Sequence, residues 1–336
     1  MALEISWRLP ASSVGSTQAG AWIQLALALE YAGIEGLWID HGIDHPESFA
    51  VAATLCAHTK KLKMTVSIAP EVMLPAALAA TVQSLQSISH LRTRLHLSDS
   101  GRNSAYRAFG EFLNRDQHSE RISEYLDLLT RLLAPYTEPF SHCGRYFQLE
   151  NAGFASRKLS PPPLVLDQSQ GSILCGRHAD LCLMSPGPLP LLQTDMQSLR
   201  GSAHAQGRDL TFCCHLNLIM ADTETQAWQL AEEHLQETGI RHPEPPVGVA
   251  AIDKAFAAIK RLQIQPQLWQ PVTGGPVFVV GTPSQVAERL ASLHELGFSH
   301  VILASDHGVA DVLRFAEQVL PALAAKGLRS TETQHV

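Results

Sequence analysis

The sequence has little positive charge and no long apolar run, and each of these absences excludes a class of function. Its 25 lysine and arginine residues are outnumbered by 32 aspartate and glutamate residues, so the net charge is −7 and the basic surface typical of nucleic-acid binding is missing. No apolar run approaches the roughly 18 residues that span a bilayer. The acidic start Met1-Ala2-Leu3-Glu4 is unlike a signal peptide. We therefore expect a cytoplasmic protein.

Cysteine pairs and glycine-rich motifs are also scarce. The six cysteines include no CxxC pair and are too few for a disulfide scaffold, which predicts reduced, buried thiols. Neither a GxGxxG run nor a P-loop occurs, so the sequence does not indicate a Rossmann or nucleotide-hydrolase fold. A Gly-x-Ser-x-Gly nucleophile elbow is missing as well.

Short apolar runs alternate with longer helical periodicities, which is typical of βα units around a parallel sheet. About eight such strands, with an extra hairpin around Gly144, favour an α/β fold of the (β/α)8 TIM-barrel type over a doubly wound sheet. We expect a single barrel domain over residues 1–336. Helices are predicted at residues 18–32, 46–58, 75–88, 104–113 and 118–134. The candidate strands are residues 3–9, 36–39, 62–68, 93–98, 164–166, 181–184, 211–220, 277–280 and 300–304.

One segment interrupts this alternation. Residues 237–275 are rich in proline, and they separate the seventh strand, 211–220, from the strand at 277–280. Because connections of this length are usually binding loops or insertions, we expect an insertion after the seventh strand that serves as a mobile lid. Residues 327–336 are expected to form a disordered tail.

Polar side chains alternate with leucines along two of the predicted strands. Arg94, His96 and Ser98 share one face of the fourth strand, and His215 and Asn217 share one face of the seventh. Since side chains of a strand alternate between its two faces, the leucines should face the helices and the polar set should face the barrel interior. For each histidine the alternative is a hydrogen-bonded structural side chain near the end of a strand.

Two further polar clusters follow strands, and together with the interior histidines they raise the question of a metal site. The residues concerned are Asp40, His41, Asp44 and His45 after the second strand and Asp306 after the last, with His96 and His215. A metal-dependent hydrolase is one interpretation. However, the spacing Asp-His-x-x-Asp-His matches no ligand motif, and the first strand lacks a His-x-His pair. We therefore expect no metal.

The chain resembles the bacterial luciferase-like, flavin-dependent monooxygenases over nearly its whole length, and within them it looks closest to the alkanesulfonate monooxygenase branch. The order and spacing of short motifs carry the resemblance. These motifs are Trp7-Arg8-Leu9-Pro10, Phe49-Ala50-Val51-Ala52-Ala53-Thr54, Ala69-Pro70-Glu71, His118-Ser119-Glu120-Arg121, Pro162-Pro163-Leu164, Gln265-Pro266-Gln267-Leu268-Trp269, Val280-Gly281-Thr282-Pro283 and Val286-Ala287-Glu288-Arg289-Leu290.

The resemblance implies a barrel with an insertion after the seventh strand and a two-component reaction. In such enzymes a separate NAD(P)H-dependent reductase supplies reduced FMN, which reacts with O2 to form a peroxyflavin that oxidises a small organic substrate. It also implies a homodimer or homotetramer. Two alternatives stay open, namely a deazaflavin-dependent oxidoreductase that transfers hydride and a non-catalytic, divergent flavin-binding homologue.

The same resemblance assigns residues to the cofactor. His96, Ser98 and Asp99 match positions that line the flavin ring, and Ala69 lies at the strand exit beside it. The phosphate would lie near Ser169 and the start of the following helix, which suits an anion. The cofactor-binding residues expected are therefore Ala69, His96, Ser98, Asp99, Ser169 and Gln170.

The chain departs from the alkanesulfonate enzymes at the substrate and phosphate positions. Asp167 places a carboxylate near the phosphate, and the two arginines that would grip a sulfonate fall at His215 and Thr273. We expect the catalytic residues His45, His215, Asn217 and Asp306 to line one cavity at the barrel mouth. This set predicts a neutral or weakly polar substrate, or a cationic one held by Asp306, with His215 partly charged below neutrality. Alternatively, Asp306 caps the final helix.

Overall fold

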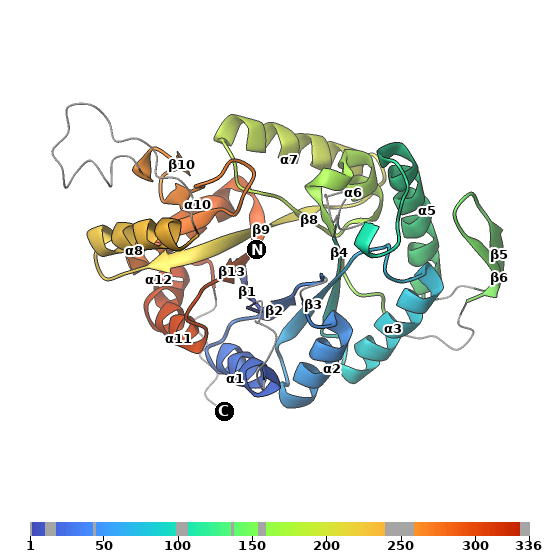
Figure 1. Ribbon diagram of the computed structural model, residues 1–336, viewed down its shortest axis with the longest axis horizontal. Helices are drawn as coiled ribbons and strands as arrows, with labels where there is room; N and C mark the ends of the chain where they lie inside the picture. The colour runs from blue at the N-terminus through green and yellow to red at the C-terminus, as the bar shows by residue number, and fades with distance from the viewer. Residues whose placement is uncertain are drawn as a thin grey trace.

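In the computed structural model, parallel strands close into a ring and helices cover its outside (Figure 1). The structure describes residues 2–10, 18–42, 45–98, 107–135, 138–153, 159–238 and 259–329. The last ring strand pairs in parallel with the first, which confirms the predicted eight-stranded TIM barrel. The strands, in ring order, are β1 (Glu4–Arg8), β2 (Gly36–Ile39), β3 (Lys63–Ile68), β4 (Thr93–Leu97), β7 (Leu164–Asp167), β8 (Leu181–Leu183), β9 (Thr211–Met220) and β13 (Phe298–Ala304).

Capping residues set the ends of some of the helices. Asn114 forms a capping box with Gln117, so α5 begins three residues before the predicted His118. Gly297 adopts a left-handed φ of 116° and ends α10. In the described part of the chain no helix is long and apolar enough to cross a membrane. The main helices are α1 (Gln18–Tyr31), α2 (Ser48–His58), α3 (Pro75–Ile88), α5 (Arg115–Leu133), α6 (Ser172–His178), α7 (Leu189–His204), α8 (Glu224–Glu237), α10 (Pro283–Leu296), α11 (Val309–Gln318) and α12 (Leu320–Ala325).

The strand predicted at 277–280 forms, but it lies beside the ring rather than in it. This strand, β12 (Phe278–Gly281), pairs with residues 217–220 of β9. The short β8 pairs only with residues 211–213 of β9, so the carboxyl half of β9 has a free edge that β12 occupies. β10 (Gln263–Gln265) and β11 (Leu268–Trp269) extend this edge in antiparallel fashion. The insertion therefore follows the seventh ring strand, as predicted.

The described part of the insertion is anchored to the barrel. Trp269 is fully buried, and its indole nitrogen donates to the Ile259 carbonyl oxygen at 3.2 Å. Its ring packs against Trp228 of α8 and Phe278 of β12. Residues 239–258, the middle of the predicted lid, lie outside the described residues, and mobility of the lid stays a prediction.

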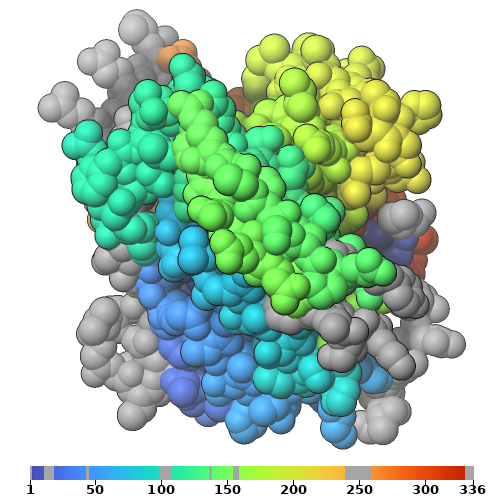
Figure 2. All heavy atoms as spheres, turned by 90° about the vertical axis from the view of Figure 1, so that its right-hand side faces the viewer, coloured from blue at the N-terminus to red at the C-terminus, as the bar shows by residue number. Residues whose placement is uncertain are grey.

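Two other segments were expected outside the barrel. The hairpin of β5 (Phe140–Cys143) and β6 (Gln148–Ala152) forms a separate sheet on the outer surface (Figure 2), where His142 contacts Glu124 of α5 at 2.9 Å. Of the expected tail, residues 330–336 lie outside the described residues. Arg329 is held by Glu35 at 2.8 Å, so the first part of that tail is anchored.

The cysteines are unpaired thiols, and five of the six are buried. The exception to the prediction is Cys143, which is exposed on the β5–β6 hairpin. The sulfur atoms of Cys175 and Cys182 lie 3.9 Å apart beneath α6. The hydrogen bond to the Cys175 thiol and burial raise the pKa of Cys182, which keeps it protonated and unreactive.

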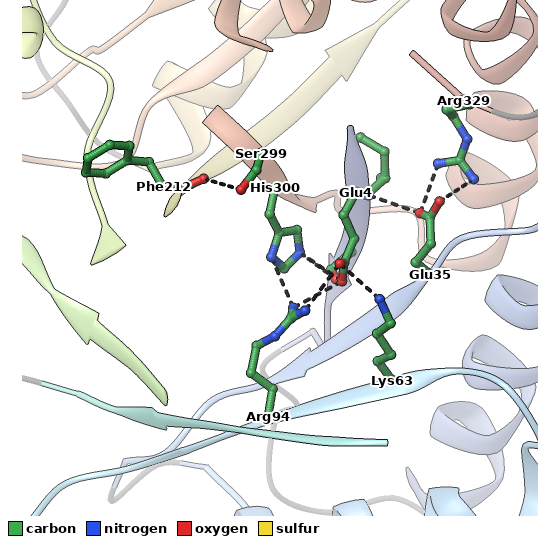
Figure 3. Close-up of polar contacts among 10 residues, drawn as sticks. Glu4, Glu35, Lys63, Arg94, Phe212, Ser299, His300 and Arg329 are labelled. Atoms are coloured by element: carbon green, nitrogen blue, oxygen red, sulfur yellow. Dashed lines mark hydrogen bonds and ion pairs between the residues drawn. The ribbon is translucent and has the colours of Figure 1, made fainter. Parts of the chain in front are cut away.

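A cluster of charged side chains fills the barrel at the amino-terminal ends of its strands (Figure 3). Arg94 binds both carboxylate oxygens of Glu4, at 3.1 and 3.2 Å, and Lys63 binds the same carboxylate at 3.0 Å. His300 contacts Arg94 at 3.2 Å and the Ser6 hydroxyl at 2.7 Å. Burial alone would raise the pKa of Glu4, but Arg94, His300 and Lys63 hold it at about 2.

Above this charged cluster the barrel interior becomes apolar. Trp38, Val165, Cys213 and Ile302 are buried together in one cluster within the ring. Such layers of inward side chains are typical of TIM barrels and leave the carboxyl ends of the strands as the open end. The fold therefore seals one end of the barrel with ion pairs and leaves a site at the other.

Candidate active site

A cavity of about 380 Å³ opens at the carboxyl ends of the strands. Its size falls within the range of small-molecule sites, roughly 300–1,000 Å³. Its walls come from five ring strands, β1, β7, β8, β9 and β13. Residues 275–277, which lead from the insertion into β12, complete them. The lining residues are Arg8, Asp167, Gln168, Ser169, Leu183, Met184, Ser185, His215, Leu216, Asn217, Gly275, Pro276, Val277, Ile302 and Ala304.

Three of the residues predicted from the sequence line this cavity: His215, Asn217 and Ser169. His215 and Asn217 lie there because they alternate with the buried Leu216 and Leu218 along β9. Ser169 lies in the single 3-10 turn η1 (Gln168–Gln170) that follows β7. Alternation and the strand end were therefore sufficient signals for these three residues.

His215 is a neutral imidazole at pH 7. Burial holds its pKa well below the usual 6.5, and the nearby Arg8, His96 and His300 depress it further. The expectation that His215 carries partial positive charge is therefore wrong, because sequence alternation does not reveal how deeply a side chain is enclosed. Among the described residues, its Nε2 atom has no hydrogen-bond partner. This nitrogen can act as a donor or an acceptor, depending on the tautomer.

Trp38 lies between two of the predicted histidines. Its ring centroid is 4.7 Å from that of His96 and 4.7 Å from that of His215. Trp38 comes from the centre of β2 and is fully buried. The indole nitrogen donates to the Asp40 carboxylate at 3.2 Å. Trp38 thus contacts both imidazoles and the Asp40 carboxylate at the barrel mouth. The sequence patterns did not indicate this role.

Arg8 and Asp40 form an ion pair at the end of β1, with the Arg8 Nε atom bonded to the Asp40 carboxylate. Arg8 also lines the cavity. In the sequence, Arg8 was noted only as part of a family motif, and Asp40 only as a possible metal ligand. The missed signal was register: Arg8 pairs with Trp38, so Asp40 lies next to it on the inward face of the neighbouring strand.

His96 faces the barrel interior, as alternation predicted, and contacts two polar groups. Its Nδ1 atom lies 2.9 Å from the Ser67 hydroxyl, and its Nε2 atom lies 3.4 Å from the Asp167 carboxylate. His96 is 5% exposed, so it reaches the cavity only through its neighbours. Asp167 is the neighbour of His96 that lines the cavity.

Asp306 and His45 do not join the cavity. Asp306 has an 83% exposed side chain and lies 3.8 Å from His234. It is not the helix cap either, because α11 begins after Gly308, without a side-chain cap. The His45 backbone amide donates to the Gly42 carbonyl oxygen at 3.1 Å. His45 is not among the residues that line the cavity. The expectation of one cavity with all four residues is therefore wrong for these two, because loop conformation does not follow from strand alternation.

The other described residues that were expected to contact the cofactor are not among those that line the cavity. Ala69 is buried directly after β3, and the Ser98 amide binds the Ile68 carbonyl oxygen at 3.0 Å. The Gln170 side-chain amide donates to the Leu97 carbonyl oxygen at 3.1 Å, and its own carbonyl oxygen has no partner among the described residues. Asp99 lies outside the described residues. Within the described ranges, no three metal-ligating side chains gather to hold an ion.

Comparison with known proteins gives a family and a shared fold. The family model described as luciferase-like monooxygenase matches residues 3–300. Among solved structures, the chain is similar to an EDTA monooxygenase from Chelativorans sp. BNC1, with a TM-score of 0.79 and 18% identity over 100% of this chain and 96% of that one.

Two further structures differ from each other in cofactor. The oxygenating constituent of 3,6-diketocamphane monooxygenase from Pseudomonas putida, in complex with FMN, has a TM-score of 0.70 and 17% identity, covering 98% of this chain and 99% of that one. The coenzyme F420-dependent tetrahydromethanopterin reductase from Methanopyrus kandleri also has a TM-score of 0.70, with 15% identity over 96% of this chain and 100% of that one. At these identities the likeness shows a common fold.

Proposed function

The chain belongs to the luciferase-like monooxygenase family, and from this premise we propose that it is a two-component, flavin-dependent monooxygenase. In this proposal a separate NAD(P)H-dependent reductase supplies reduced FMN, and the enzyme uses O2 to oxidise a small organic substrate. The cavity at the carboxyl ends of the strands is the observation that carries the proposal. The family predicted from the sequence is confirmed, whereas the alkanesulfonate branch stays a prediction.

The cavity residues suit the ring of a flavin. The walls combine apolar side chains, such as Leu183 and Met184, with the hydrogen-bonding side chains of Ser185 and Asn217. The His215 Nε2 atom, which has no partner among the described residues, can act as a donor or an acceptor toward an isoalloxazine edge. When bound, reduced flavin would supply the electrons that activate oxygen.

In this proposal each residue at the site has a role that its geometry supports. The neutral His215 hydrogen-bonds the ligand without adding charge. Asn217 fixes its orientation from the same face of β9. Residues 275–277 cover one side of the cavity and exclude water. Asp40 pairs with Arg8 at the end of β1, so the guanidinium that lines the cavity already has a counter-ion.

The charges around the cavity favour a neutral or weakly polar substrate over an alkanesulfonate. Asp40 neutralises Arg8, and His215 is uncharged at pH 7. A sulfonate would need an unpaired cationic partner to replace its hydration. The alternative of a cationic substrate held by Asp306 loses its support, because that carboxylate is exposed and outside the cavity.

One alternative function has an observation in its favour. A structure that matches this chain over 96% of its length belongs to a reductase that depends on coenzyme F420. The second candidate is therefore a deazaflavin-dependent oxidoreductase that transfers hydride without consuming O2. A divergent homologue that binds flavin without catalysis is the remaining possibility from the sequence. Oxygen uptake separates the first two, and turnover separates both from the third.

The test uses the purified protein with FMN, a flavin reductase and NAD(P)H. We expect substrate-dependent oxygen uptake with ketones, aldehydes or thioethers, and little with alkanesulfonates. Strong and selective oxidation of an alkanesulfonate would contradict the substrate class. Light scattering on the same sample tests the predicted homodimer or homotetramer.

A further inference from the structure

The η1 turn after β7 forms the end of the cavity where the resemblance places a flavin phosphate. Ser169 lies in this turn, and Asp167 immediately precedes it. Both residues line the cavity, so any group that reaches Ser169 also approaches the Asp167 carboxylate. A phosphate monoester carries up to two negative charges at neutral pH and is repelled by a carboxylate at short range.

Asp167 lies beside a buried imidazole. Its Oδ2 atom lies 3.4 Å from the His96 Nε2 atom, and the His96 Nδ1 atom lies 2.9 Å from the Ser67 hydroxyl. Ser67 and His96 are both buried, in the adjacent strands β3 and β4. Asp167 therefore lies between a buried imidazole and the cavity.

A second carboxylate lies on the outer side of the same turn. Asp195 of α7 accepts a hydrogen bond from the Gln168 side-chain amide at 2.7 Å. Two carboxylates therefore approach the turn that would hold a phosphate. The following helix, α6, has seven residues and begins at Ser172, after Gly171, without a side-chain cap. Its short dipole offsets this negative potential only weakly.

On the basis of the proposed function, we propose that this cavity recognises the flavin ring and not the phosphate, so that riboflavin binds at least as tightly as FMN. Asp167 is the specificity-determining residue, because its carboxylate repels the phosphate end of FMN. The ribityl hydroxyls of riboflavin are uncharged and hydrogen-bond to Asp167 and Ser169 without repulsion. The same enzyme would therefore accept reduced flavin with or without its phosphate.

Equilibrium binding of riboflavin and FMN, followed by flavin fluorescence, tests the proposal on the wild-type protein. The ratio of the FMN Kd to the riboflavin Kd should be one or greater. Raising the salt from about 0.01 M to about 0.15 M shortens the screening length from about 30 Å to about 8 Å. FMN binding should therefore tighten with salt, while riboflavin binding stays within about twofold.

Asp167→Asn removes the charge and keeps the shape of the side chain. It should tighten FMN binding by about tenfold and change riboflavin binding by less than about twofold. Glu233→Gln is the matched control, because it removes one negative charge from the exposed surface of α8. It should leave both dissociation constants unchanged.

Two outcomes overturn the proposal in different ways. If wild-type protein binds FMN at least tenfold more tightly than riboflavin and loses this preference as salt rises, the phosphate is recognised and only this inference fails. If neither flavin binds, the proposed function fails with it. Because the salt series uses the wild-type protein, the proposal stays testable even if Asp167→Asn does not fold.

Discussion

Arg94→Met should lower the stability of the fold, because it disrupts the ion-pair cluster at the closed end of the barrel. This change keeps most of the side-chain volume and removes the guanidinium that binds both oxygens of Glu4. Arg94 and Glu4 have side-chain exposures of 10% and 20%, so the pair is largely shielded from solvent. Removing one partner of such a pair costs about 3–5 kcal/mol, because the other charge stays buried.

The pKa of Glu4 gives an independent magnitude. Its fall from 4.5 to about 2 corresponds to about 3 kcal/mol of stability at neutral pH, since one pKa unit is about 1.4 kcal/mol. The folded-state pKa is depressed, so this contribution is present above pH 4.5 and is lost as the pH falls toward 2. We therefore expect the stability difference between wild type and Arg94→Met to narrow on acidification.

Urea unfolding followed by circular dichroism at pH 7, 5, 4 and 3 measures this difference. Arg145→Met is the matched control, because Arg145 forms an ion pair with Glu120 in which both side chains are more than half exposed. Its loss should cost less than about 1 kcal/mol. The double variant Glu4→Gln/Arg94→Met should recover much of the stability. A loss of less than about 1 kcal/mol in Arg94→Met at pH 7 would contradict a buried, stabilising ion pair. A difference from wild type that widens as the pH falls would contradict it as well.

Three further predictions concern other parts of the molecule. Burial lowers the pKa of His300 from 6.5 to about 3, so the unfolded protein binds a proton that the folded protein excludes, and stability falls as the pH drops from 6.5 toward 3. His300→Gln should make the free energy of unfolding less dependent on pH over that range. Trp269→Ala removes the buried ring that anchors the insertion and should cost about 3–5 kcal/mol in urea unfolding; a loss below about 1 kcal/mol would contradict that anchoring. His96→Ala should weaken reduced-flavin binding or increase peroxide release in coupled assays, because it frees Asp167 from its contact; unchanged affinity and coupling would make His96 a purely structural residue.

Periodic patterns in the sequence predicted the barrel and part of the site. The inward positions of His96, His215 and Asn217 follow from strand alternation, which is a local property of the chain. The Arg8–Asp40 pair was missed because it depends on the register between two strands. Asp306 and His45 were misplaced because they lie in loops, whose conformation no short period specifies. The position of β12 beside the ring reflects the unequal lengths of β8 and β9, which appears only after the sheet is assembled.

Anaerobic binding of reduced FMN to the wild type and to the cavity-filling variant Ala304→Phe shows whether the cavity is the flavin site. Ala304 lines the cavity at the end of β13, so a phenyl ring there occupies the proposed ring site. Ala325→Phe makes the same change at an exposed position of α12 and serves as the control. We expect saturable one-to-one binding of reduced FMN to the wild type and the control, and at least tenfold weaker binding to Ala304→Phe. No saturable binding by the wild type, or equal binding by all three proteins, would contradict it.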